Sequence, residues 1–157
     1  MIDFNVKRSL FIILLPMILI AIFMFGCKKG GIVNNEPNIP LEYRGRTVNV
    51  QGDIYVQSRE ITFRVWDHGQ IDGDIISLVV NDRVVLDTFE LRGPQAIREV
   101  VVTLEFGGYN YVMLFAHNEG FIPPNTVALA IDDGVTEQEI ILEANLYTNG
   151  AYNLIVD

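Results

Sequence analysis

The sequence predicts an all-β fold: an antiparallel two-sheet β-sandwich of the immunoglobulin-like or jelly-roll kind, after an N-terminal signal segment and a linker. Short runs rich in β-branched and aromatic residues recur about every 8–12 residues from Arg46 onward, the spacing typical of such folds. Several runs alternate apolar with polar residues, which is the period of a strand that buries one face. No stretch past residue 45 shows a sustained helical period. Together these observations favour one domain of stacked sheets.

The composition excludes several classes of partner and site. The chain has 157 residues, enough for one domain, and a formal net charge of −9. Loss of residues 1–26 would remove Asp3, Lys7 and Arg8 and leave a charge of about −10. A surface this acidic repels phosphate backbones, so no nucleic acid is expected as a partner. Cys27 is the only cysteine, which excludes an internal disulfide and the paired spacings of zinc sites.

The first element in order is the segment 1–26. Lys7 and Arg8 precede an apolar run over residues 10–25, which Pro16 interrupts. A charged start followed by an apolar run is the layout of an export signal peptide. The run ends at Gly26, directly before Cys27.

The site Met24-Phe25-Gly26-Cys27 resembles the lipobox of bacterial lipoproteins. The resemblance implies that the leader is cut before Cys27, that the Cys27 thiol carries a diacylglycerol and that the new amino group is acylated. Several acyl chains, at ~0.8 kcal/mol per buried CH₂, would hold the protein on a membrane. We therefore expect a lipid-anchored protein of the cell envelope. Lys28 after the cysteine favours the outer membrane by the rules of that family, with the domain in the periplasm or at the cell surface.

Two alternatives to the lipid anchor stay open. The apolar run is about 17 residues long, close to what an uncleaved membrane-spanning helix needs, and Pro16 would kink such a helix without forbidding it. The second alternative is a fully secreted form.

Residues 27–45 are predicted to form the lipidated cysteine and a flexible tether. They are rich in glycine and asparagine and contain Pro37 and Pro40, which is linker composition. An additional edge strand is disfavoured here because proline cannot donate a ladder hydrogen bond.

The predicted β-sandwich spans residues 46–157. Alternation is clearest where Ile61, Phe63 and Val65 form one face, and we expect these three in the core. Trp66 then lies on the opposite face, partly covered by a neighbouring loop. Turn residues at 81–82, 107–108, 123–125 and 132–134 separate the runs. The expected strands are 46–50, 53–56, 60–67, 75–80, 83–91, 97–106, 109–118, 126–132, 137–144 and 151–157.

An acidic loop between two expected strands is the candidate metal site. Asp67, Asp72 and Asp74 fall within eight residues that also contain two glycines. Calcium takes 6–8 oxygen ligands, and extracellular modules bind it at ~10⁻⁴–10⁻³ M. The three aspartates are therefore candidate calcium ligands, and Asn118 and Asn125 from a later loop are candidates to complete the site. The spacing is not that of an EF-hand, and three solvated turn aspartates are the alternative.

The surrounding motifs carry a second resemblance. The pattern V-W-D-x-G-x-x-D-G-D-x-I-S-L-x-x-N, followed by A-x-N-x-G-x-x-P-P-N-T and D-D-G, is similar to small β-rich modules in secreted proteins and lipoproteins of Gram-negative bacteria. The resemblance implies a β-sandwich at the cell surface or in the periplasm and no particular activity. The matching positions are Asp67, Asp72, Gly73, Asp74, Asn81, Asn118, Gly120, Pro123, Pro124, Asn125 and Thr126.

Signals of catalysis are weak, and we expect the protein not to be an enzyme. Beyond the leader the only serines are Ser58 and Ser77, and neither lies in a G-x-S-x-G turn. No Gly-rich phosphate loop or metal-binding helix is present in the sequence. His68 beside Asp67 is expected to be an exposed loop histidine. A small hydrolase that uses two carboxylates is the remaining catalytic alternative.

The sequence thus predicts a non-catalytic binding or structural module of the cell envelope, with an envelope protein as the favoured partner. The alternative is a carbohydrate-binding accessory module that uses Trp66 and loop residues such as Asn118 and Asn125. No cofactor other than calcium is suggested.

Overall fold

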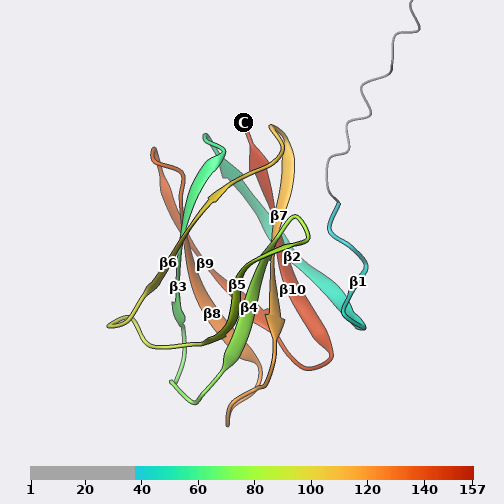
Figure 1. The fold of residues 1–157 in the computed structure, drawn as a ribbon, viewed down its shortest axis with the longest axis vertical. Helices are drawn as coiled ribbons and strands as arrows, with labels where there is room; N and C mark the ends of the chain where they lie inside the picture. The colour runs from blue at the N-terminus through green and yellow to red at the C-terminus, as the bar shows by residue number, and fades with distance from the viewer. Residues whose placement is uncertain (1–37) are drawn as a thin grey trace, which may run out of the picture. The chain divides into compact units, whose positions relative to one another are not determined.

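The computed structural model describes residues 38–157 and contains ten strands and no helix within that range (Figure 1). The predicted signal peptide, Cys27 and the first part of the tether lie outside the described residues. The strands are β1 Glu42–Tyr43, β2 Arg46–Val56, β3 Glu60–Asp67, β4 Ile75–Val80, β5 Arg83–Glu90, β6 Arg98–Thr103, β7 Tyr109–Ala116, β8 Asn125–Asp132, β9 Glu137–Ala144 and β10 Thr148–Val156. Over the same range, nothing is helical and apolar enough to cross a membrane.

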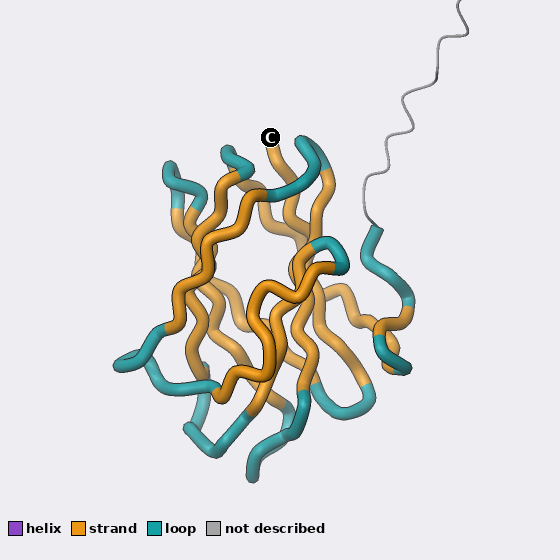
Figure 2. Tube along the Cα trace, viewed as in Figure 1, coloured by secondary structure: helices purple, strands orange, loops and turns teal. Residues whose placement is uncertain are grey.

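The strands form two sheets that pack face to face, which confirms the predicted two-sheet sandwich (Figures 1 and 2). One sheet has six strands in the order β1-β2-β10-β7-β4-β5, and the other has four in the order β6-β3-β8-β9. All pairs are antiparallel except β2 and β10, which run parallel with Thr47 opposite Thr148. The sandwich is therefore antiparallel apart from this one pair.

The two expected strands 46–50 and 53–56 form one continuous strand, β2. The register between β2 and β10 shifts at Ala151 and Tyr152, so that Tyr152 lies opposite Gly52 and β2 carries one additional residue there. A Cβ atom at Gly52 would lie 2.7 Å from the Tyr152 ring, so only glycine allows the ring to pack against β2 at this point. Gly52, which lies between the two expected strands, is therefore part of a strand, where it makes room for the Tyr152 ring.

The predicted core is confirmed on β3. Ile61, Phe63 and Val65 are fully buried between the sheets, whereas Trp66 on the other face is only partly buried. Burial of an apolar side chain of this size stabilises the fold by about 1.5–3 kcal/mol. Inward-facing residues of both sheets, among them those of β2, β4, β7, β8 and β9, belong to the same cluster.

A second, smaller apolar cluster lies on the outer face of the six-stranded sheet. Val79, Tyr111, Met113 and Ala151 are buried there, and Ile39 packs against them together with Tyr43 and Val48. The end of the predicted tether is therefore part of the folded domain: β1 pairs with β2, and Val48 N donates to Leu41 O at 3.0 Å. Pro40 does not prevent this pairing because it precedes a strand of only two residues.

Four loops meet at one end of the sandwich, the lower end in Figure 1. The strand register requires this: Asp67 at the end of β3 pairs with Val127 near the start of β8, and Ile76 near the start of β4 pairs with Ala116 at the end of β7. We call this the site end. Its loops are 68–74, 91–97, 117–124 and 145–147.

Candidate metal centre

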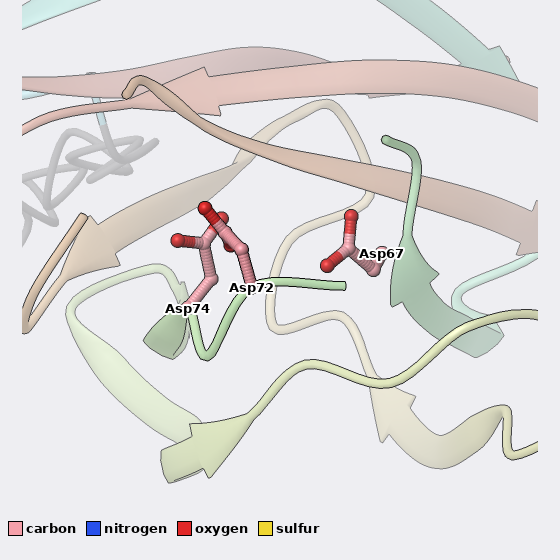
Figure 3. Close-up of side chains that lie close together, drawn as sticks. All are labelled: Asp67, Asp72 and Asp74. Carbon is pink, nitrogen blue, oxygen red and sulfur yellow. The ribbon is translucent and has the colours of Figure 1, made fainter. Parts of the chain in front are cut away.

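The three aspartates predicted as calcium ligands come together at the site end (Figure 3). Asp67 is the last residue of β3, and its side chain lies on the same inward face of the strand as that of Val65. Asp74 lies just before β4, in phase with the buried Ile76, and Asp72 lies in the loop before it. One oxygen from each carboxylate lies within 4.8 Å of the others. Residues that flank strands of both sheets therefore converge on one point and could hold a metal ion.

Burial distinguishes this cluster from solvated turn aspartates. Asp67 and Asp74 are each only 3% exposed. Within residues 38–157, neither Asp67 Oδ2 nor Asp74 Oδ1 has a hydrogen-bond partner. A buried carboxylate oxygen without a partner is costly unless it is protonated or its charge is compensated by a cation. The alternative of three solvated aspartates therefore does not describe Asp67 and Asp74.

The electrostatics of the cluster favour a positive occupant. Burial raises the pKa of Asp74 to about 7, and the neighbouring charges of Asp72, Asp67 and Glu119 contribute in the same direction. Burial also raises the pKa of Asp67, although the Gly69 N–H that donates to Asp67 Oδ1 at 2.9 Å opposes the effect. A carboxyl group that holds a proton near neutral pH can exchange it for a metal ion, which compensates the same charge.

Asn125 adds a neutral oxygen at the same end of the interior. It is the first residue of β8 and is fully buried, and within the described range neither Oδ1 nor Nδ2 has a hydrogen-bond partner. Its side chain lies on the same strand face as that of Val127, the residue that pairs with Asp67. Side chains at such diagonal positions approach one another. Amide oxygen is a normal calcium ligand, so Asn125 stays a predicted ligand, on the strand next to the one that ends at Asp67.

Asn118 has a different position. Its Oδ1 accepts from Ile75 N at 2.6 Å, and its Nδ2 donates to Gly73 O at 2.8 Å. Both side-chain atoms are therefore used to brace the segment that carries Asp72 and Asp74. This arrangement fixes the acidic loop against the end of β7.

Trp66 lies away from the acidic cluster. It is on the outer face of the four-stranded sheet, because Asp67 beside it faces inward, and it pairs with Ala128. Ile141, which is 39% exposed, lies opposite Ala128 on the next strand. A carbohydrate contact through Trp66 stays a prediction, and the acidic cluster would not take part in it.

Sequence reasoning missed a polar cluster on the outer face of the six-stranded sheet. The fully buried Ser77 donates its hydroxyl hydrogen to Asp87 Oδ1 at 2.8 Å and lies 2.7 Å from His117 Nε2. Thr88 N donates to the same hydroxyl oxygen at 3.2 Å. With the Ser77 hydrogen on the bond to Asp87, the His117 tautomer that carries its hydrogen on Nε2 would donate to the same hydroxyl oxygen. No spacing signal could reveal this cluster, since Ser77 and His117 are 40 residues apart.

Comparison with protein-family models, with curated proteins and with solved structures found no match for this chain.

Proposed function

We propose that this chain is a lipid-anchored protein of the bacterial envelope whose β-sandwich is a non-catalytic binding module with a calcium ion at its site end. One observation is the main support for the proposed cation site. Asp67 and Asp74 are buried beside Asp72, and each has a carboxylate oxygen without a hydrogen-bond partner among residues 38–157. A divalent cation would satisfy these oxygens and compensate their charge.

The donor set suits calcium. It consists of three carboxylates and, from Asn125, one amide oxygen, and such hard oxygen donors select magnesium or calcium over softer metals. The donors come from two strand ends and one irregular loop, and calcium tolerates such irregular geometry better than magnesium does. Water molecules would complete the 6–8 ligands that calcium takes. An affinity of ~10⁻⁴–10⁻³ M would suit a protein exposed to extracellular calcium.

Calcium is expected to raise the melting temperature of the protein. At 10 mM calcium and a Kd of ~0.1–1 mM, linkage gives about 1.4–2.7 kcal/mol of stabilisation, which corresponds to a rise of roughly 5–10 °C for a domain of this size. Differential scanning calorimetry in calcium and then in EGTA measures it. The matched control is the Asp67→Asn, Asp74→Asn double variant, which should show no shift. A wild-type protein with the same melting temperature in both buffers would contradict the site.

The anchor has its own test, mass spectrometry of the mature N-terminus. The expected N-terminal residue is Cys27, with a thioether-linked diacylglycerol on its sulfur and an acyl chain on its amino group. An unmodified peptide that runs from residue 1 through Cys27 would contradict the lipoprotein assignment.

A protein partner is favoured because large apolar side chains are exposed on the loops of the site end. Phe121 is 90% exposed and Tyr147 is 80% exposed, and Ile71 is 60% exposed. Such side chains gathered on one end of a domain are typical of contact surfaces. Ser77 is fully buried, so its hydroxyl is not accessible to a substrate, which supports a non-catalytic role.

A further inference from the structure

The loop between β7 and β8, residues 117–124, has an apolar tip that the fold leaves open to solvent. Phe121 is 90% exposed and the next residue, Ile122, is 54% exposed. Two exposed apolar side chains on a loop are stabilised little by packing against the rest of the domain. Hydrogen bonds from their backbone N–H groups hold the two residues in place.

That backbone is bound to one of the three aspartates of the cation site. Asp72 Oδ2 accepts from Phe121 N at 2.8 Å and from Ile122 N at 2.6 Å. Both bonds go to Oδ2, so the other oxygen of the same carboxylate, Oδ1, takes part in neither of them. Figure 3 shows the carboxyl group of Asp72 beside that of Asp74.

The contact between loop and carboxylate is close enough to require a glycine. Gly120 has φ +51°, in the left-handed region, and a Cβ atom there would lie 2.5–2.7 Å from the atoms of the Asp72 carboxyl group. Any side chain at position 120 would push the loop and Asp72 apart. The loop is thus shaped around this carboxylate.

Neighbouring contacts extend the coupling across the site end. Asn118, earlier in the same loop, is bonded to Ile75 and Gly73 on either side of Asp74. Glu119 Oε1 accepts from Leu146 N in the 145–147 loop at 3.2 Å. Three loops of the site end are therefore linked through side chains that lie next to the acidic cluster.

We infer that a cation bound by Asp67, Asp72 and Asp74 orders the 117–124 loop through Asp72 and so fixes Phe121 and Ile122 in their exposed position. Without a cation, those carboxylates that are ionised repel one another, and Asp72, the least buried of the three, moves most easily and takes the loop with it. With a cation, Asp72 is held on one side by the metal and on the other by two backbone N–H groups. The inference rests on the proposed cation site and gives it a role: binding of the cation controls whether Phe121 and Ile122 are held in their exposed position.

Hydrogen–deuterium exchange tests this on the full chain, purified in detergent, in 10 mM calcium and in EGTA. The amides of Phe121 and Ile122 are expected to exchange about tenfold more slowly in calcium, since exchange follows local opening. Unchanged exchange in a protein whose melting temperature responds to calcium would overturn the inference and leave the cation site intact. If the melting temperature does not respond either, the proposed site fails, and the inference fails with it.

A pair of glycine variants separates loop coupling from cation binding. Gly120→Ala should lose the calcium-dependent protection of the two amides. Its calcium-induced rise in melting temperature should be smaller than in wild type, because the added Cβ atom also displaces Asp72, but should not vanish while Asp67 and Asp74 remain. Gly107→Ala is the matched control, because a Cβ atom at Gly107 meets nothing within 4 Å, and it should behave as wild type. Full calcium-dependent protection in Gly120→Ala would overturn the coupling through Asp72.

Discussion

Replacing Asp74 with asparagine is expected to stabilise the cation-free protein at alkaline pH and to abolish its response to calcium. Burial raises the pKa of Asp74 from 3.8 to about 7. A carboxyl group with a raised pKa in the folded state stabilises the fold at low pH, and this stability is lost as the pH rises from about 4 to about 7. Asparagine has no charge to develop, so the variant avoids the loss.

The measurement is urea unfolding in EGTA at pH 5 and at pH 8. The free energy of unfolding of the variant, relative to wild type, should increase by about 2–3 kcal/mol between these two pH values. The control variant is Asp53→Asn, which removes an exposed carboxylate that bonds to Asn153 and should show no such increase. Equal pH dependence in wild type and the Asp74→Asn variant, or a calcium response retained by that variant, would contradict the buried-carboxylate site.

Replacing Phe63 with alanine is expected to destabilise the domain by about 3–5 kcal/mol. Phe63 is fully buried in the middle of β3, where it packs between the two sheets, and truncation of a buried phenylalanine removes its burial energy and leaves a cavity. This is a large share of the 5–15 kcal/mol by which domains are stable.

Tyr147→Ala is the matched control for the core, because it truncates an aromatic side chain that is 80% exposed. It should change the free energy of unfolding by no more than about 0.5 kcal/mol. Urea unfolding in calcium measures both variants. A Phe63→Ala variant as stable as Tyr147→Ala would contradict the placement of β3 in the core.

The strands could be predicted from the sequence because their signals are local. Alternation in residues 61–66 identifies the buried face of β3, and the turn at Asn81 and Asp82 appears with φ of 47° and 62°, the left-handed values that asparagine and aspartate tolerate. The parallel pairing of β2 with β10 could not be predicted, since it joins segments about 100 residues apart. The packing of Ile39 and Tyr43 was also missed, because the outer cluster they cover forms only once β4, β7 and β10 lie side by side.

The acidic residues of the candidate site were predictable for the same reason: Asp67, Asp72 and Asp74 are close together in the chain. Their burial was not, because it depends on β8 and on the opposite sheet closing over the site end. The orphaned amide of Asn125 comes from the start of β8, and the two N–H bonds to Asp72 come from the 117–124 loop, about 50 residues away. Sequence patterns therefore identified the ligand candidates, and only the fold shows that two of them are buried with carboxylate oxygens that have no hydrogen-bond partner among residues 38–157.

Isothermal titration of calcium into the cation-free protein directly tests whether the buried aspartates hold a divalent cation. We expect one site per chain with a Kd of ~10⁻⁴–10⁻³ M, and no binding when Asp67 and Asp74 are both replaced by asparagine. A wild-type titration that shows no binding at millimolar calcium, or a double variant that binds as wild type does, would contradict the proposed site.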